Sequence, residues 1–219
     1  MAIFDEELTR LKEKILEMGA LVEISIKDSV RSLVERDNEL AQEVIQRDHI
    51  VNAFDVEIDE ECIRLIALRQ PKASDLRFIT TAMKIITDLE RMGDLAANIA
   101  ERALELNREP NIKPYVDIPR MRDIAHGMTR DALDAFVHKD KRLAMDVIMR
   151  DDEIDDLKHA IISELLFLMV EDPNIICRAM RITFIAQYLE RFADHATNIA
   201  EMVVYLVEGK FIRHTPIPE

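Results

Sequence analysis

The stretch Leu89–Glu101, LERMGDLAANIAE, decides the fold, because it returns one hundred positions later as Leu189–Glu201, LERFADHATNIAE. Nine of the thirteen positions are identical. Each copy carries a polar stripe at spacing i, i+4, i+8 and i+11, which lies on one face of an α-helix. The stripes consist of Glu90, Asp94, Asn98 and Glu101 in the first copy, and of Glu190, Asp194, Asn198 and Glu201 in the second. A stripe present in both halves predicts a shared role.

A second echo supports an internal duplication. Val34–Asp48, VERDNELAQEVIQRD, matches Val137–Asp151, VHKDKRLAMDVIMRD, at an offset of 103. Two echoes in the same order and at near-equal offsets indicate a tandem repeat of about one hundred residues. Because there are only two copies, we expect a duplicated bundle and not a solenoid.

The composition favours an all-α globular protein. The 219 residues are 48% hydrophobic and 33% charged, with 4 glycines, 7 prolines and no tryptophan. The net charge of -14 argues against a nucleic-acid-binding surface and against a basic patch for free phosphate. It is compatible with cation binding or with a basic protein partner.

Nothing in the sequence predicts export or a membrane span. The start of the chain, MAIFDEELTRLKEK, has no apolar segment typical of a secretory signal, and the longest apolar run is Leu165–Val170. We therefore expect a cytoplasmic protein that meets the membrane only through partners. Cys62 and Cys177 are far apart, and we interpret both as small buried hydrophobic residues.

Apolar residues at helical spacing predict six long helices in two tandem three-helix bundles. Asp37 and Asp140 are predicted N-caps of the second helix of each half, and Ser74 or Asp75 of the third helix. The predicted helices span about 5–36, 38–70, 74–107, 120–138, 140–171 and 175–208. The predicted division is a first bundle at 1–109, a proline-rich linker at 110–119 and a second bundle at 120–219.

Folding each half at its hairpin brings two acidic stripes together, because helices joined by short turns are antiparallel neighbours. A turn at residues 72–73 places Asp48 opposite position 97, and a turn at 173 places Asp151 opposite position 195. The acids of the second helix of each half then face the stripe on the third helix.

Three interpretations of these facing acids stay open. The stripes can simply face water, or arginines such as Arg91 and Arg191 can pair with them on a partner-binding surface. They can also bind a cation, and oxygen-rich sites suit Mg, Ca, Mn or Fe. His159 and His195 stand beside acids in the second half only, so we interpret both as surface residues.

Catalytic motifs are missing from the sequence. It contains no nucleophile elbow, P-loop, Rossmann glycine pattern or HExxH, and 4 glycines leave no phosphate-cradling loop. We therefore predict that the chain is not an enzyme.

The sequence resembles the PhoU family of bacterial phosphate-transport accessory proteins. The resemblance rests on Arg69–Arg77, RQPKASDLR, on the repeated Glu-x-x-x-Asp stripes, and on the ending Glu208–His214, EGKFIRH. It covers essentially the whole chain. It implies a cytoplasmic, commonly dimeric negative regulator of the phosphate-starvation response. Such a regulator acts between the ATPase of the phosphate ABC transporter and a membrane sensor histidine kinase.

The resemblance also implies iron or zinc on the paired motifs, without excluding Mg, Ca or Mn. Carried over by position, the candidate ligands are Asp48, Glu90, Asp94 and Asn98 in the first half, and Asp151, Asp155, Glu190, Asp194 and Asn198 in the second. Because Asn52 stands where the second half has Asp155, we expect weaker metal binding in the first bundle.

Two rival classes remain. A ferritin-like di-metal oxidase or iron store needs Glu-x-x-His pairs on two helices, and the sequence contains none. The other rival is a plain helical adaptor without metal.

Overall fold

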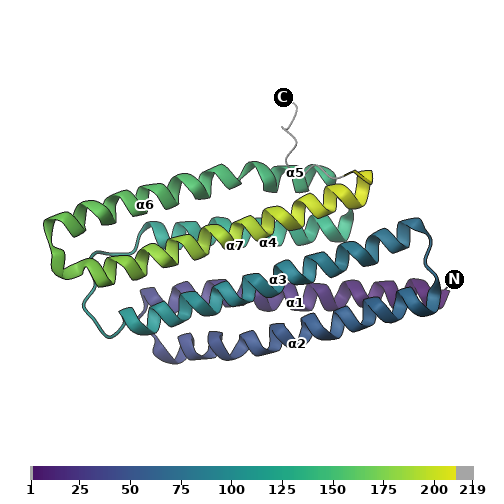
Figure 1. Ribbon diagram of the computed structural model, residues 1–219, viewed down its shortest axis with the longest axis horizontal. Helices are drawn as coiled ribbons and strands as arrows, with labels where there is room; N and C mark the ends of the chain where they lie inside the picture. Colours follow the sequence, from purple (N-terminus) through teal and green to yellow (C-terminus); the bar gives the residue numbers. More distant parts are fainter. Residues whose placement is uncertain (1, 211–219) are drawn as a thin grey trace.

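The structure, a computed structural model, describes residues 2–210, with side chains described from Phe4 onward. It is all-α, as predicted, and its helices run along the long axis of the molecule (Figure 1). The elements are α1 (Ala2–Val34), α2 (Asn38–Arg69), α3 (Ala73–Leu106), α4 (Asp117–His138), α5 (Lys141–Met149), α6 (Asp151–Glu171), the 3-10 turn η1 (Pro173–Ile175) and α7 (Ile176–Glu208). None of the described helices is long and apolar enough to span a bilayer. The ending from Phe211 onward lies outside the described residues.

Side-chain caps fix the start of the second helix in each half. Asp37 accepts a hydrogen bond from the Leu40 amide at 3.0 Å, and Asp140 accepts from the amides of Arg142 and Leu143. Both predicted caps are confirmed, because each carboxylate satisfies amides that lack an intrahelical partner.

The predicted cap of the third helix is wrong. Helix α3 begins at Ala73 after Lys72, which makes no side-chain capping bond, so Ser74 and Asp75 already lie inside the helix. The preceding residue Gln70 adopts a left-handed conformation that ends α2, and Pro71 follows it. Helix α3 therefore starts without a capping side chain.

The second helix of the second half is interrupted. The sequence predicts one helix over 140–171, but α5 ends at Met149 and α6 restarts at Asp151, with a turn at Arg150. The guanidinium of Arg150 reaches back to Asp131 of α4 at 2.6 Å. Helices α5 and α6 together thus occupy the place that α2 holds in the first half.

The two bundles share one hydrophobic core. Helices α1 to α3 form one layer and α4 to α7 the other, with α3 and α7 side by side (Figure 1). Met92 of α3 and Phe192 of α7 are fully buried in the same apolar cluster, together with Ile15 of α1 and Phe136 of α4. The two halves therefore stabilise each other through apolar burial.

Helices α3 and α7 are antiparallel. Arg181, near the start of α7, pairs with Glu105 near the end of α3 at 2.7 Å. At the opposite end, the Arg77 guanidinium lies 5.9 Å from the ring centroid of Tyr205. Each half thus presents its third helix to the other, as a two-fold arrangement of repeats requires.

Helices α1 and α4 also cross between the bundles. Glu23 Oε2 of α1 lies 3.0 Å from Nε2 of His126 on α4. These two residues are separated by 103 positions, the repeat offset of this region, so they occupy equivalent places in the two halves. The contact therefore marks the axis that relates the repeats.

Candidate functional site

The first acidic cluster lies between α2 and α3. We define it as Asp48, Asn52, Asp55, Glu90 and Asp94. Asn52 donates to Asp48 Oδ2 at 3.0 Å, and Arg91 lies 3.4 Å from both Glu90 and Asp94. Burial, followed by the neighbouring Asp94 charge, raises the pKa of Asp48 and of Glu90. The predicted Arg91–Asp94 contact is present, and the predicted meeting of the two stripes occurs.

The register differs from the expectation by about one turn. A Cβ built on Gly93 would lie 3.1 Å from Asp48 Oδ1, so Asp48 faces position 93 and not 97. The hairpin turns at Gln70 and Pro71, two residues earlier than assumed, and such a shift moves the opposing residue by four. The register changes, but the two acidic stripes still face each other.

The second acidic cluster lies between α6 and α7. We define it as Asp151, Asp155, Lys158, Glu190 and Asp194. The Lys158 ammonium donates to Asp155 at 2.7 Å and to Glu190 at 2.8 Å. Although burial lowers the pKa of Lys158, these two contacts raise it overall, so the ammonium stays charged. The cluster thus carries its own cation.

Burial is the largest influence on the pKa values of Asp194 and Asp151 in the second cluster. Burial and the neighbouring Glu190 raise the pKa of Asp194 to about 6. Burial likewise raises the pKa of Asp151, while a 3.3 Å hydrogen bond from Thr197 opposes the rise. This contact places Asp151 opposite 197, two residues from the predicted 195, because η1 lengthens the turn.

The two clusters differ at two equivalent positions. At the repeat offset of 103, Asn52 corresponds to Asp155 and Asp55 corresponds to Lys158. The first cluster therefore replaces one acid by an amide, and the second replaces one acid by an ammonium. The importance of Lys158 was missed from the sequence, although the offset to Asp55 was a usable signal.

The first cluster fits a cation better than the second. Asp48 Oδ1 and Asn52 Oδ1 are buried and have no hydrogen-bond partner, and buried acceptors of this kind are costly unless something binds them. In the second cluster the Lys158 ammonium already occupies the space between Asp155 and Glu190. Between residues 2 and 210, no three Asp, Glu, His or Cys side chains form a ready metal-binding group. Side-chain movement would be needed for coordination.

The predicted asparagine ligands lie apart from this pattern. Asn198 donates to Asp88 Oδ1 at 3.4 Å, across to α3, and Asn98 is half-buried one turn beyond Asp94. His195, interpreted as a surface residue, instead lies 2.8 Å from the same Asp88 oxygen. This contact could not be found from the hairpins, because it joins different halves.

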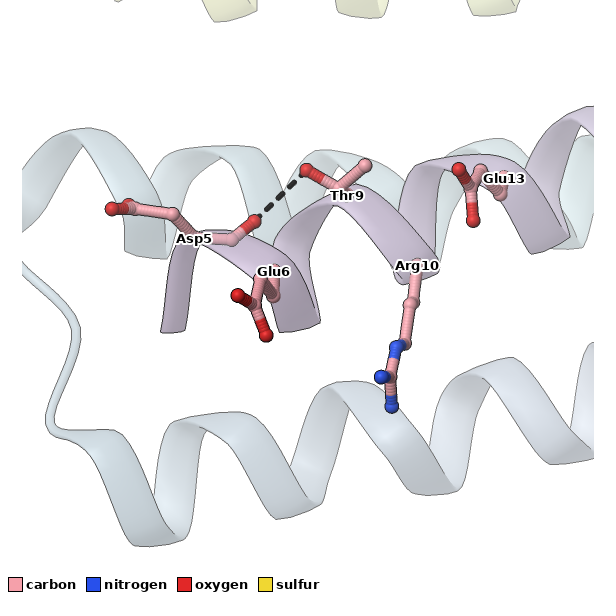
Figure 2. Close-up of a pocket in the computed structure, with 5 residues that line it drawn as sticks. All are labelled: Asp5, Glu6, Thr9, Arg10 and Glu13. Carbon is pink, nitrogen blue, oxygen red and sulfur yellow. Dashed lines mark hydrogen bonds between the residues drawn. The ribbon is translucent and has the colours of Figure 1, made fainter. Parts of the chain in front are cut away.

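Surface hollows also lie outside the clusters, among them the following two. One, on the first turns of α1, is lined by Asp5, Glu6, Thr9, Arg10 and Glu13, all from a single helix (Figure 2). Thr9 in this hollow bonds the Asp5 carbonyl at 2.9 Å, so its hydroxyl is already used. The other hollow, of about 400 Å³, lies between α2, α3 and α7 and is lined by Asp59, Met83, Lys84, Thr87, Asp88, Asn198 and Met202.

The fold and the twin acidic clusters define a duplicated helical-bundle protein, and comparison with known proteins gives its family. The chain matches the PhoU domain at residues 15–103 and again at 118–203. It is 45% identical to the phosphate-specific transport system accessory protein PhoU homolog of Aquifex aeolicus, over 98% of this chain and 97% of the relative. The chain belongs to the PhoU family.

Solved structures support the same assignment. The crystal structure of PhoU from Pseudomonas aeruginosa matches with a TM-score of 0.91 and 41% identity, over 94% of this chain and all of the other. The phosphate transport system regulatory protein PhoU from Streptococcus pneumoniae matches with a TM-score of 0.89 and 34% identity, over 95% and 98% of the two chains.

Proposed function

We propose that this chain is an accessory regulator of phosphate uptake that represses the phosphate-starvation response when phosphate is plentiful. The observation that carries the proposal is the full-length similarity to proteins named phosphate-specific transport system accessory protein, at 45% identity over 98% of the chain. The proposed partners are the ATPase of the phosphate ABC transporter and a membrane sensor histidine kinase. We place the action in the cytoplasm and expect a homodimer, as the family resemblance implies.

The chemistry of the chain supports an adaptor more than a catalyst. The clusters contain carboxylates, an amide and a lysine, but no nucleophile paired with a base. The net charge of -14 and the length of the helices offer extended acidic surfaces for protein contacts. The rival ferritin-like oxidase lacks its required Glu-x-x-His pairs in this sequence.

We further propose that the first cluster binds a divalent cation. Asp48, Asn52, Glu90 and Asp94 would hold it, because the first two carry buried unpartnered oxygens and the other two are adjacent acids. When bound, the cation would neutralise the acids between α2 and α3. An all-oxygen donor set favours Mg, Ca, Mn or iron over zinc. The expectation of weaker binding in the first bundle rested on Asn52 alone, and Lys158 now argues for the opposite order.

Complementation tests the regulatory proposal. The chain is expressed in a bacterial host that lacks its own PhoU, and alkaline phosphatase is measured in phosphate-rich medium. Restored repression, with an empty vector as the negative control and the host protein as the positive control, is the expected result. Persistent phosphatase activity from a soluble, abundant chain, combined with oxygen consumption on ferrous iron, would instead support the oxidase.

Calorimetric titration with Mn²⁺ tests the cation proposal. Glu90→Ala/Asp94→Ala should abolish Mn²⁺ binding at the first cluster, whereas Glu190→Ala/Asp194→Ala should leave it intact. Lys158→Met should create a second site by exposing Asp155 and Glu190, and Lys14→Met is a matched control, because Lys14 bridges Glu57 and Glu61 elsewhere. Unchanged Mn²⁺ binding in the Glu90/Asp94 variant would show that these residues are not ligands.

A further inference from the structure

The outer end of the α6–α7 hairpin exposes a group of large apolar side chains. We call it the hairpin patch: Leu166, Phe167 and Val170 on α6, with Ile176, Met180 and Phe184 on α7. The residues are between 38% exposed, at Phe184, and 82% exposed, at Val170. Single exposed apolar residues are ordinary, but clustered ones mark interaction surfaces.

The hairpin patch continues the face that carries the second acidic cluster. From Glu190, steps of three and four residues toward the start of α7 lead through Gln187 to Phe184 and then to Met180. On α6, two steps of four residues lead from Lys158 to Leu166. Because Lys158 and Glu190 are in contact at 2.8 Å, both lines start at one point between the helices.

The first half shows that the fold does not require the whole of this apolar surface. At the repeat offsets, Phe167 corresponds to Arg64, Met180 to Thr80 and Phe184 to Lys84. The remaining counterparts are Ile63 and Leu76, which are 54% and 39% exposed, and Ala67. Arg64 pairs with Glu7 at 3.2 Å, so the same hairpin end in the first half is partly covered with charge. The first half therefore keeps a smaller apolar surface at this end, and the large apolar side chains at Phe167, Met180 and Phe184 are particular to the second half.

One patch residue is held in a fixed orientation. The ring of Phe184 stacks on Tyr188, one turn along α7, with centroids 6.4 Å apart and an interplanar angle of 21°. A preordered aromatic ring loses little conformational entropy on binding, which suits it to anchor a partner.

The charges around the patch favour a basic partner. At the inner end, the four carboxylates of the second acidic cluster outnumber Lys158, which pairs with Glu190, and the neighbouring Arg191, and the exposed Glu171 and Asp172 lie at the hairpin tip. Anionic groups at both ends, with a net charge of -14, disfavour a second copy of the chain and an anionic membrane. They favour a segment that carries apolar side chains between basic ones.

We propose that the hairpin patch docks an amphipathic helix of a partner protein, with its apolar side chains against Met180 and Phe184 and its lysines or arginines over the flanking acids. The inference rests on the proposed function and deepens it, because it gives the adaptor a docking surface and its partner a chemistry. Recognition of this kind uses apolar anchors at i, i+3 or i+4 spacing.

A model peptide tests the proposal without a known partner. The probe is a fluorescein-labelled amphipathic helix of leucine and lysine, and its leucine–glutamate analogue controls for charge. Fluorescence anisotropy should show binding of the lysine peptide that weakens from about 50 to about 500 mM salt, and no binding of the glutamate peptide. Met180→Thr/Phe184→Gln, which leaves the net charge unchanged, should weaken binding at least about tenfold.

A matched variant separates the patch from general acidity. Ile50→Thr/Val56→Gln removes two apolar residues of α2 that are 50% and 58% exposed, and it should retain wild-type affinity. Leu166→Gln/Val170→Gln on α6 provides a second patch variant if the α7 variant unfolds, as judged by circular dichroism. Wild-type affinity in both folded patch variants would overturn the proposal, as would equal losses in the α2 control.

Two further measurements test whether a second copy of the chain or a membrane occupies the patch instead. Light scattering that finds a dimer for the wild type and a monomer for the patch variant would make the patch a self-interface and overturn the proposal. Sedimentation of the wild type, but not of the patch variant, with phosphatidylglycerol vesicles would make the patch a membrane-binding surface and would also overturn the proposal. Because the complementation assay uses the wild-type chain and no peptide, a failure of the regulatory proposal remains distinguishable from a failure of this one.

Discussion

His195 of α7 and Asp88 of α3 are joined by a contact of 2.8 Å between Nδ1 and Oδ1, so a polar pair links the two bundles. Both side chains are only about one-fifth exposed, at 20% and 18%. Asn198 adds a longer contact to the same oxygen. The interface between α3 and α7 thus contains this hydrogen-bonded group in addition to the Arg181–Glu105 ion pair.

We expect His195→Ala to destabilise the protein by about 1–2 kcal/mol, because it leaves the Asp88 carboxylate partly buried without its main partner. Urea unfolding followed by circular dichroism measures the change. His159→Ala is the control, since exposed His159 contacts only the carbonyl of Asp155 on its own helix, and its effect should stay within about 0.5 kcal/mol. Equal effects of the two substitutions would mean that the cross-bundle contact contributes nothing.

The Glu23–His126 pair predicts two opposite pH dependences. Burial raises the pKa of Glu23 above 4.5, so the folded state retains a proton there that the unfolded chain loses, and stability falls as pH rises through that window. Burial, followed by Lys27 and other nearby cations, lowers the pKa of His126 below 6.5. The unfolded chain then binds the extra proton, and stability rises as pH increases toward 6.5.

Substitution separates these two effects. Relative to the wild type, His126→Gln should lack the rise toward pH 6.5, and Glu23→Gln should lack the fall above pH 4.5. Urea midpoints measured between about pH 4 and pH 8 report both differences. Parallel pH profiles for the wild type and both variants would contradict the assignment.

Gly93 lets α2 approach α3 closely. A Cβ there would lie 3.1 Å from both Asp48 Oδ1 and Val51 Cγ1, whereas the equivalent position on α7 is the fully buried Ala193. Gly93→Ala should cost about 1–2 kcal/mol, because crowding of about 1–3 kcal/mol exceeds the gain in helix propensity. Ala193→Gly should also destabilise, by about 1 kcal/mol, through lost helix propensity. Stabilisation by Gly93→Ala would show that α2 can move to accommodate the added Cβ without loss of stability.

The two thiols should react at very different rates. Cys62 is buried, and burial raises its pKa to about 12, whereas Cys177 is exposed at the start of α7. A colorimetric disulfide reagent at neutral pH should modify Cys177 quickly and Cys62 only in denaturant. Cys177→Ser should eliminate the fast phase, and a remaining fast phase would place Cys62 at the surface.

Much of this architecture could be predicted because the repeated segments show where equivalent helices begin and end in the two halves. The spacing of apolar residues predicted the helices. Asp37 and Asp140 predicted where two of them start, since a capping carboxylate bonds only to nearby amides. The hairpin argument predicted that Asp48 lies near Glu90 and Asp94. The predicted register was off by about one helical turn, because the hairpin bends at Gln70 and not at residues 72–73.

What could not be predicted depends on contacts between distant segments. The helix break at Arg150 has no proline or glycine at that position, and the Arg150–Asp131 pair does not explain it, because the equivalent Arg47–Asp28 pair accompanies the continuous α2. Cys177 was expected to be buried and is exposed, because helical spacing alone does not say which face a neighbour covers. The Asp88–His195 contact required knowledge of how the bundles meet.

The meeting of Glu23 with His126 bears on the ancestry of the molecule. If two separate single-repeat chains formed the same two-fold assembly, the residue at this place would face its own copy, since a two-fold interface pairs each patch with itself. Glutamate would then face glutamate. Fusion of the repeats into one gene lifts this restriction, so that an acid can face an imidazole and each half can specialise separately.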